Sequence, residues 1–340
     1  GRHDQDEDRW MQWLKNRGLS AGCKIPMVEY NPVLPDDAME ADVRALARLA
    51  IQEDLNGEVD WTSVSTIPSE RRGKCEIMPR QSGTLAGLVC VPWVISESAA
   101  ELECIAHAKD GDEMVPQQSV MRLEGRVRDM LTIERIVLNM VNRLCGVATL
   151  TAQFVREIGD APARLYDTRK TTPGWRRIEK YAVRCGGGHN HRTGLFDGFL
   201  IKDNHLALGG EPGTPIAPSE AVRRARLFAQ QTVTDEQDIE TQGMQPPGIV
   251  EIEVDSLSQL ENVLPLGPDI VLVDNFTTDM LRQAVKMRDD LAPAVELEAS
   301  GGVGLKTVRE IAETGVDRIS SGSLTHQAVS LDLGLDWVRG

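Results

Sequence analysis

The sequence predicts an α/β protein with two domains: an N-terminal α+β domain with a small sheet, followed by a β/α barrel. Three observations favour this fold class. A chain of 340 residues is long enough for two domains of roughly 100–200 residues each. Hydrophobic residues make up 41% and charged residues 26%, as in globular proteins. Beyond about residue 163, short β-branched runs alternate with helical segments, which indicates a parallel sheet covered by helices.

The first domain is expected over residues 31–146. Residues 1–30 are polar and acidic at their start, which predicts a flexible N-terminal segment and a first helix. The domain begins with a helix from Asp36 to about Leu55, where apolar residues recur at helical spacing. Three strand-like runs and then two helical patterns follow, at 75–80, 83–91, 124–131, Thr132–Asn142 and Val147–Glu157.

The barrel is expected over residues 147–326. Its sheet is predicted from six strand-like runs, at 163–168, 197–202, 249–254, 269–274, 295–299 and 316–320. The last four runs begin 20, 26 and 21 residues apart, which favours a barrel over a doubly wound open sheet, and no G-x-G-x-x-G follows any run. Residues 207–247 have Pro- and Gly-rich ends and a polar tail, so we expect an inserted or mobile excursion there.

Charge is distributed unevenly along the chain. The formal net charge is -15 and aromatic residues make up 4%, which argues against nucleic-acid binding. Residues 164–192, however, hold eight Lys or Arg and two acids, giving a local charge of +6. Such a cationic island predicts a pocket for a small polyanion. Its helical part is expected to face solvent with three cations, Arg176, Arg177 and Lys180.

Other residues of the island, and those after later strands, are expected at the barrel mouth. Arg169, Lys170 and Lys202 follow or end strands, the position at which β/α barrels place their active sites. Carboxylates that could bind Mg²⁺ or sugar hydroxyls lie at or near successive strand ends, at Glu253, Asp274 and Glu298. The last two strands run into Ser-Gly loops at 300–304 and 320–326, which predict a phosphate site.

Histidines and cysteines are sparse. His189, His191, His205 and His326 are expected to bind an anion or substrate, because no third His or Cys completes a zinc site. The six cysteines contain no C-x-x-C pair and are expected to be reduced, mainly buried thiols. With no secretory signal and no apolar run of about 18 residues, these features predict a cytoplasmic protein without a membrane segment.

Several long motifs, in the same order, resemble quinolinate phosphoribosyltransferases (nicotinate-nucleotide pyrophosphorylases, carboxylating). They are YDTRKTTPGWRRIEKYAVRCGGGHNHRTGLFDGFLIKDNH, IEVDSL, IVLVDNF, LEASGG and GVDRISSGSLTH, with ERIVLNMVNRLCGVATLT upstream. The resemblance covers about residues 40–326. It implies an N-terminal α/β sandwich and an incomplete C-terminal β/α barrel, and we expect residues 327–340 to pack back on the sandwich. It also implies a homodimer or higher oligomer with shared active sites.

The resemblance further implies a reaction and a set of site residues. Quinolinate and phosphoribosyl pyrophosphate would give nicotinate mononucleotide, pyrophosphate and CO₂, with Mg²⁺ as cofactor. Quinolinate would be held by Thr168, Arg169, His191, Arg192 and, from the partner subunit, Arg135. Catalysis would involve Lys170, Lys202, Glu253 and Asp274, with Mg²⁺ near the two acids. The phosphoribosyl group and its phosphate would be bound by the same four residues and by Ser300, Gly301, Gly322 and His326.

Two other functions are weighed against this one. A nicotinate phosphoribosyltransferase without decarboxylation would need to bind only one carboxylate, whereas the number of cations here favours a dianion. A non-catalytic phosphate-binding protein on a decayed barrel would not need acids at positions 253 and 274. The excursion is the clear departure from the family pattern, since it is longer than the usual connection by roughly 20 residues.

Overall fold

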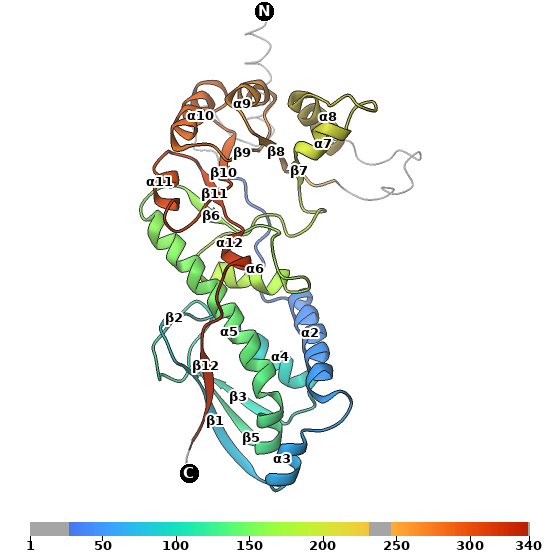
Figure 1. Ribbon diagram of the computed structural model, residues 1–340, viewed down its shortest axis with the longest axis vertical. Coiled ribbons are helices and arrows are strands. Elements are labelled where there is room, and N and C mark those ends of the chain that lie inside the picture. The colour runs from blue at the N-terminus through green and yellow to red at the C-terminus, as the bar shows by residue number, and fades with distance from the viewer. Residues whose placement is uncertain (1–26, 231–245, 339–340) are drawn as a thin grey trace, which may run out of the picture.

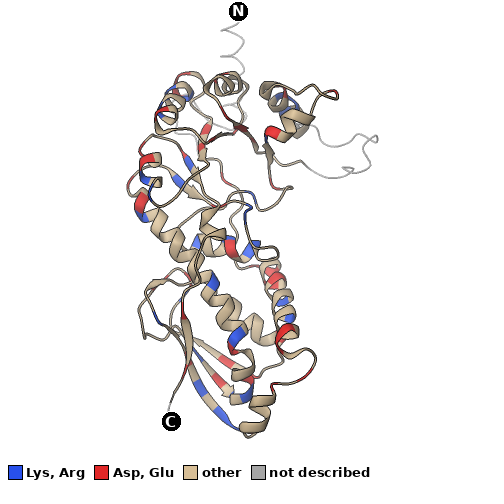
Figure 2. Cartoon of the chain, in the orientation of Figure 1, with Lys and Arg blue, Asp and Glu red and all other residues tan. Residues whose placement is uncertain are grey.

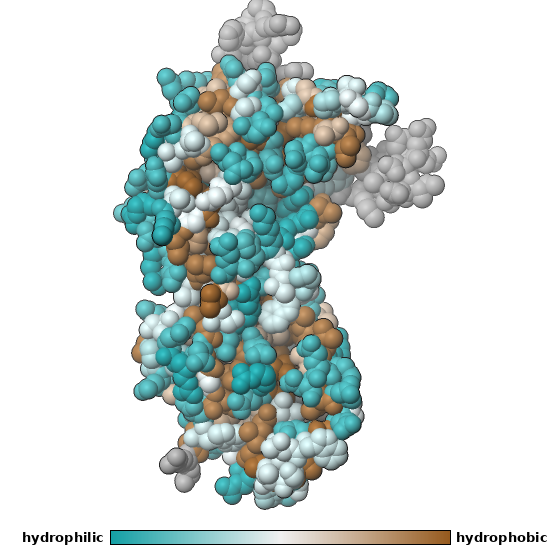
Figure 3. Space-filling model, viewed as in Figure 1, coloured by the Kyte–Doolittle hydropathy of each residue, from teal (hydrophilic) through white to brown (hydrophobic). Residues whose placement is uncertain are grey.

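The computed structural model describes residues 27–230 and 246–338, which form two parts joined by one long helix (Figure 1). The first helix expected within residues 1–30, as well as Cys23 and residues 231–245 of the excursion, lies outside the described residues. The molecule is narrower where the two parts meet, as the space-filling view shows (Figure 3).

The N-terminal part is built on a four-stranded antiparallel sheet in the order β12-β1-β5-β3. Its strands are β1 (Arg72–Pro79), β3 (Leu102–Ala106), β5 (Met121–Arg126) and β12 (Leu333–Trp337). Alternate residues of β1 are buried, Cys75 and Ile77 among them, because successive side chains of a strand point to opposite faces. The other elements of this part are α2 (Asp37–Leu55), α3 (Trp61–Thr66), β2 (Gly83–Thr84), α4 (Cys90–Glu97) and β4 (Glu113–Met114).

A single helix, α5 (Val127–Ile158), replaces the separate elements expected in this stretch. The run 124–131 is only partly strand, since β5 ends at Arg126, and the two expected helices are one. Gly146, between the two expected patterns, is part of this helix. A Cβ there would lie 2.2 Å from the carbonyl oxygen of Val329, so glycine lets the C-terminal segment pack directly on α5.

The C-terminal part contains a six-stranded parallel sheet in the order β6-β11-β10-β9-β8-β7, which confirms the predicted fold class. Each expected run overlaps one of its strands, and only β10 extends past its run, by one residue. The strands are β6 (Arg164–Tyr166), β7 (Phe199–Ile201), β8 (Val250–Val254), β9 (Ile270–Asp274), β10 (Glu296–Ser300) and β11 (Arg318–Ser320). The edge strands β6 and β7 are not paired with each other among the described residues, so the barrel has an open seam. Its remaining elements are α6 (Arg176–Cys185), α7 (Asp203–Leu208), α8 (Pro218–Gln230), α9 (Leu257–Val263), η1 (Leu264–Leu266), α10 (Thr278–Leu291), α11 (Val308–Ala312) and α12 (Ser323–His326).

Two segments differ from the expected domain plan. Helix α8, in the middle of the expected excursion, is a packed element: Val222 is fully buried, Phe228 packs edge-on against Phe199, and Arg226 pairs with Asp269 at 2.8 Å. Residues 27–30 are part of the barrel rather than a flexible end, since Tyr30 is only 3% exposed. At the other terminus, β12 pairs with β1, far from it in sequence.

Candidate active site

The carboxyl ends of the parallel strands bring the predicted acids and one lysine to the same end of the barrel. Asp274 ends β9 and lies opposite Ser300, which ends β10, while Glu253 lies near the end of β8. Lys202 follows β7, and its Nζ atom lies 2.5 Å from Oε2 of Glu253. Strand register therefore collects these four residues at one mouth.

A tight turn supports the two loops at Asp274 and Ser300. Asn275 has a left-handed backbone (φ 57°), donates its backbone N–H to the Ser300 carbonyl at 3.0 Å, and donates its amide to Oδ2 of Asp274 at 2.7 Å. Gly301 has φ +88°, and a Cβ there would lie 2.2 Å from Oδ1 of Asn275. Only glycine suits both the backbone conformation and this close approach.

Three predicted phosphate-binding residues meet beside the loop after β11. A Cβ on Gly322 would lie 2.7 Å from Cδ of Lys170 and 3.2 Å from Cδ2 of His326. The hydroxyl of Thr325 donates to the carbonyl of Lys170 at 2.6 Å, which joins the loop after β6 to the loop after β11. The missing side chain at position 322 thus leaves backbone close to a lysine and a histidine, as a phosphate cradle requires.

Two arginines, Arg169 and Arg192, lie close to each other near the mouth. Nε and Nη1 of Arg169 are buried and have no hydrogen-bond partner among the described residues. Arg192 is 8% exposed, and its Nη1 donates to the Gly198 carbonyl at 3.0 Å. Burial and the nearby charge of Arg169 lower the pKa of Arg192. Two neighbouring cations, one of them with unsatisfied buried donors, favour binding of an anion with several oxygen atoms.

The remaining predicted quinolinate residues are placed differently. Thr168 lies just before Arg169, and its hydroxyl accepts the backbone N–H of Lys170 at 3.0 Å. Arg135 lies on the exposed face of α5 in the N-terminal part and has no ion pair among the described residues. The structure of one chain therefore does not bring Arg135 together with the barrel residues.

His191 lies in the barrel interior, where both of its ring nitrogens have partners. Its Nδ1 accepts the backbone N–H of Arg192 at 2.8 Å, so the ring proton is on Nε2, which lies 3.0 Å from Oε2 of Glu251. Oε1 of Glu298 is 3.5 Å from the same nitrogen. His189 instead lies 3.7 Å from Glu29, so the two histidines of the H-x-H sequence do not converge.

Two sequence expectations about charged residues are wrong. Glu298 does not reach the mouth: it is fully buried, and its Oε2 accepts from Nε of Arg318 at 2.8 Å, because its side chain points into the barrel. Lys180 does not face solvent. It is fully buried in an ion pair with Asp167, which also accepts the backbone N–H of His191 at 2.8 Å. The remaining cations of α6 are half-buried, with Arg177 paired to Asp42 at 2.9 Å.

An ion pair that the sequence did not predict, between Arg143 and Glu179, links the loop after β6 to the segment after β11. Glu179 on α6 accepts from Nε and Nη2 of Arg143 on α5, at 3.0 and 2.8 Å, and from the backbone N–H of Thr172 at 3.0 Å. Arg143 also donates to the carbonyls of Thr325 and Ala328, at 2.5 and 2.6 Å. No spacing in the sequence signals this pair, because its members are 36 residues apart.

The five cysteines in the described part of the chain show no sign of a reactive thiol. Cys75, Cys90 and Cys145 are buried. Burial raises the pKa of Cys145 to about 12 and that of Cys104 to about 11, so neither thiol ionises readily near neutral pH. None of the helices in the described residues is long and apolar enough to cross a membrane. The cytoplasmic location stays a prediction.

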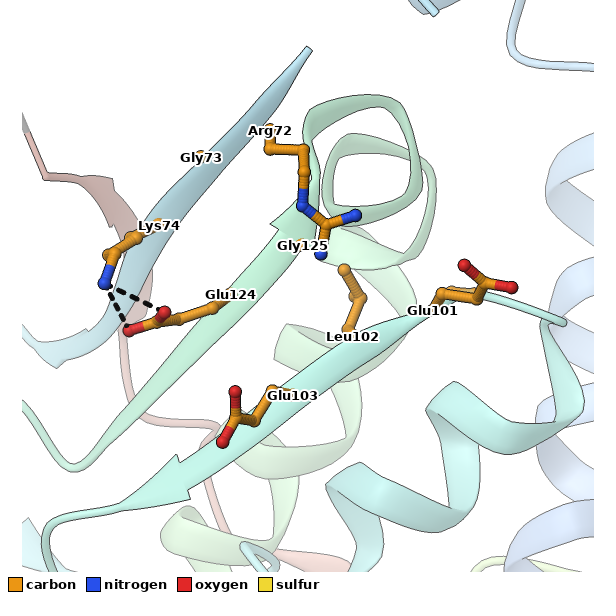
Figure 4. A pocket seen from close by; sticks show the side chains of 9 residues that line it. Arg72, Gly73, Lys74, Glu101, Leu102, Glu103, Glu124 and Gly125 are labelled. Carbon is orange, nitrogen blue, oxygen red and sulfur yellow. Dashed lines mark hydrogen bonds and ion pairs between the residues drawn. The ribbon is translucent and has the colours of Figure 1, made fainter. Parts of the chain in front are cut away.

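A hollow of about 560 Å³ lies away from the barrel mouth, on the outer face of the N-terminal sheet (Figure 4). Its charged lining side chains carry both signs, and Lys74 and Glu124 are paired at 2.9 Å. None of the site residues predicted from the sequence lines it. The barrel mouth is therefore the candidate active site.

Comparison with known proteins gives the family. Residues 60–145 match the model of the quinolinate phosphoribosyl transferase N-terminal domain, and residues 147–336 match that of its C-terminal domain. The chain belongs to the quinolinate phosphoribosyltransferase family. The family, its transferase activity in NAD biosynthesis and the α/β fold, all predicted from the sequence, are confirmed.

Individual relatives of this family match over most of their length. The nicotinate-nucleotide pyrophosphorylase (carboxylating) of Mycobacterium leprae is 37% identical over 295 residues, covering 86% of this chain and 96% of the relative. A probable enzyme of the same name from Bacillus subtilis is 38% identical over 285 residues, covering 84% and 89%. The solved nicotinate-nucleotide pyrophosphorylase of Francisella tularensis superposes with a TM-score of 0.76 at 32% identity, covering 92% of this chain and 100% of that one.

Proposed function

We propose that the barrel mouth transfers the phosphoribosyl group of phosphoribosyl pyrophosphate to the ring nitrogen of quinolinate. The products are nicotinate mononucleotide, pyrophosphate and CO₂, in the biosynthesis of NAD. The observation that carries the assignment of the site is the neighbouring pair Arg169 and Arg192. Two buried guanidinium atoms of Arg169 have no hydrogen-bond partner among the described residues, and burial, together with the nearby charge of Arg169, lowers the pKa of Arg192. Quinolinate has two adjacent carboxylates, and two guanidinium groups suit such a dianion.

Quinolinate binding is assigned to the end of the barrel next to β6. Arg169 and Arg192 would bind the carboxylates, and Thr168 would line the same pocket. His191 forms the floor beneath Arg192, since its Nδ1 accepts the backbone N–H of Arg192. Arg135 would complete this subsite from the partner subunit.

Phosphoribosyl pyrophosphate binding is assigned to the loops after β8 to β11. The 5′-phosphate would lie in the cradle of Lys170, Gly322 and His326, with Ser300 and Gly301 at its edge. The ribose hydroxyls would bind Glu253 and Asp274, which lie at or near the carboxyl ends of the neighbouring strands β8 and β9. Lys202, beside Glu253, would lie between the two substrates.

The acids Glu253 and Asp274 also suit Mg²⁺. Each has one carboxylate oxygen, Oε1 and Oδ1, without a hydrogen-bond partner among the described residues, because Lys202 and Asn275 contact only the other oxygen. Hard oxygen donors of this kind bind Mg²⁺ together with substrate phosphates. When bound, Mg²⁺ would neutralise charge on the departing pyrophosphate.

The chemistry requires no covalent bond to the protein. The bond from ribose C1 to pyrophosphate breaks with its electron pair leaving on pyrophosphate, and the quinolinate nitrogen donates its pair to C1. Glu253 and Asp274 would stabilise the positive charge that develops on the ribose. The ring is then cationic, so the adjacent carboxylate leaves as CO₂, its bonding pair stays on the ring carbon, and a proton from water replaces it. Lys170 or Lys202 would stabilise that electron pair electrostatically.

We also propose that two subunits share each site. Arg135 is exposed on α5 and is not joined to its own barrel mouth. Large apolar side chains near site residues are exposed as well: Leu195 and Phe196 close to Arg192, and Leu208 on α7 after Lys202, at 73%, 75% and 82%. A second copy that covers these side chains would bring its own Arg135 to the mouth.

One assay tests the function. Quinolinate labelled at the carboxylate beside the nitrogen is incubated with phosphoribosyl pyrophosphate and Mg²⁺, and nicotinate is assayed in parallel. We expect labelled CO₂ and nicotinate mononucleotide from quinolinate, dependent on phosphoribosyl pyrophosphate. Turnover of nicotinate alone would contradict the proposed function and support the non-decarboxylating alternative. Absence of reaction with both substrates would support a binding protein.

A further inference from the structure

A segment from outside the barrel strands enters the barrel interior. The backbone N–H of Val28 donates to Oε1 of Glu296 at 2.5 Å, and the Val28 carbonyl accepts from Nη1 of Arg318 at 2.6 Å. Farther along, the backbone N–H of Val33 donates to Oδ1 of Asn190 at 2.8 Å. Residues 28–33 therefore contact β10, β11 and the loop residue Asn190 before α2 begins at Asp37.

Tyr30 is the side chain of this segment that contacts His191, the residue beneath Arg192 in the proposed quinolinate subsite. Its hydroxyl donates to Oε2 of Glu251 at 3.0 Å, the same oxygen that Nε2 of His191 contacts at 3.0 Å. The rings of Tyr30 and His191 pack with centroids 4.8 Å apart. Since the other oxygen of Glu251 has no partner among the described residues, Tyr30 and His191 together hold this carboxylate.

Tyr30 also touches the support of the arginine guanidinium. A Cβ on Gly198 would lie 2.7 Å from Cε1 of Tyr30, so the ring lies directly against the Gly198 backbone. The carbonyl of Gly198 accepts from Nη1 of Arg192 at 3.0 Å. At the other end of Arg192, the backbone N–H donates to Nδ1 of His191.

We propose that Tyr30 is a positioning residue for quinolinate, acting through Arg192. Both ends of Arg192 rest on groups that Tyr30 contacts: the backbone end rests on the His191 ring and the guanidinium end on the Gly198 carbonyl. Tyr30 itself does not bind substrate. The inference rests on the proposed function, because it takes Arg192 as a quinolinate residue.

The hydroxyl and the ring of Tyr30 have separable roles. The hydroxyl orients Glu251 and through it the His191 ring, while the ring buttresses Gly198. Removal of the hydroxyl alone leaves a buried carboxylate with one contact fewer, which loosens His191 without opening a cavity. The effect should fall on quinolinate, because no phosphate or ribose residue proposed above contacts Tyr30.

The test is steady-state kinetics of Tyr30→Phe in the full chain, with quinolinate and phosphoribosyl pyrophosphate varied in turn. We expect the KM for quinolinate to rise about fivefold, because the lost hydrogen bond acts on substrate only through Glu251, His191 and Arg192, with the KM for phosphoribosyl pyrophosphate and kcat within about twofold. Gly198→Ala should give the same pattern, because the added Cβ would displace the Tyr30 ring from its contact with the Gly198 backbone. Circular dichroism and thermal unfolding establish that each variant is folded.

Tyr166→Phe is the matched control. Tyr166 is equally buried, and its hydroxyl donates to Oε1 of Glu29 in the same N-terminal segment at 2.8 Å, but it does not contact Glu251 or Gly198. A similar loss of thermal stability with an unchanged quinolinate KM is expected. An equal rise in the quinolinate KM for Tyr166→Phe would show a general effect of the segment and overturn the proposal.

The outcome also separates this inference from the proposed function. An unchanged quinolinate KM in both Tyr30→Phe and Gly198→Ala, with a large loss in Arg192→Met, would overturn the role of Tyr30 and leave the site assignment intact. An unchanged quinolinate KM in Arg192→Met would overturn the site assignment and the inference with it. A rise in both substrate KM values for Tyr30→Phe would indicate a structural role only.

Discussion

The outer face of the N-terminal sheet and the barrel mouth both carry many charged side chains, but these differ in their partners. On the sheet, cations and anions lie together on neighbouring strands (Figure 2), and Arg122 pairs with Glu76 at 2.6 Å and Lys74 with Glu124 at 2.9 Å. At the mouth, buried guanidinium atoms of Arg169 have no partner among the described residues. Paired, exposed charges are already satisfied, whereas buried, unpaired charges need a ligand.

The same contrast explains why the hollow on the sheet is not an active site (Figure 4). It is lined by Arg72, Lys74, Glu101, Glu103 and Glu124, so charges of both signs face it. Exposed side chains of both signs neutralise one another and solvate well. Cavity size alone is thus a poor guide to function in this chain, and unsatisfied buried donors are a better one.

The largest expected effect comes from neutralising a cation at the barrel mouth, with a cation on the N-terminal sheet as the comparison. Arg169→Met should lower kcat/KM for quinolinate about 100-fold or more, because charge-assisted hydrogen bonds in a buried site are lost. Arg122→Met should change it less than about twofold, since an exposed ion pair contributes little. Steady-state kinetics of the two variants make the measurement. Similar effects of both would break the contrast.

Arg135 is the exposed cation of the N-terminal part that this contrast does not explain, and subunit mixing tests it. Arg135→Ala and Lys202→Ala chains should each be nearly inactive alone. After equal mixing with subunit exchange, about a quarter of wild-type activity should return, because half of the dimers are mixed and each has one intact site. No recovery after exchange has been verified by mass spectrometry would contradict a shared site.

Weakening the Arg143–Glu179 ion pair, which links the loop after β6 to the segment after β11, should give an intermediate effect. Glu179→Gln weakens the contacts with Arg143 and Thr172, so the loops bearing Lys170 and Gly322 lose their common support. We expect the KM values for both substrates to rise about fivefold to tenfold. Arg177→Met, which breaks an outer ion pair of the same helix, serves as the control and should leave both KM values nearly unchanged.

The smallest expected effect is a pH-dependent change in stability at Glu29. Although burial acts to raise it, hydrogen bonds with His189, Tyr166 and Arg164 lower the pKa of Glu29 to about 2. A lowered pKa stabilises the fold above the unfolded value of about 4.5 and loses this effect as the pH falls toward 2. Wild type should exceed Glu29→Gln in Tm by roughly 2–3 °C at pH 6, and the gap should shrink at pH 3. A constant gap would contradict the shift.

Several features could be predicted because they depend on local pattern. Each of the six barrel strands overlaps an expected run, and register then places Glu253, Asp274 and Ser300 together. Motif resemblance extends this to the family. The domain limits, the site residues and the shared site stay predictions.

Other features depend on contacts between distant segments, which local pattern does not contain. Two helical patterns are expected at 132–142 and 147–157, whereas the structure has one helix, in which Gly146 allows the C-terminal segment to pack directly on α5. Lys180 is assigned to solvent until Asp167 is found beside it in the interior. Glu298 is predicted at the mouth from its position near a strand end. That position does not say whether the side chain points to the mouth or, as the structure shows, into the barrel interior.

By itself, the sequence determined the order of strands and helices, the concentration of cations at residues 164–192 and the family. These follow from spacing and composition, which are properties of neighbouring residues. Only the tertiary structure decided which of those charges are satisfied. Arg169 and Lys180 lie eleven residues apart in the same basic island, yet Lys180 pairs with Asp167 in the interior, whereas Arg169 keeps donors without partners among the described residues. Burial and the distance to an opposite charge separate them, and both depend on how the chain folds back on itself.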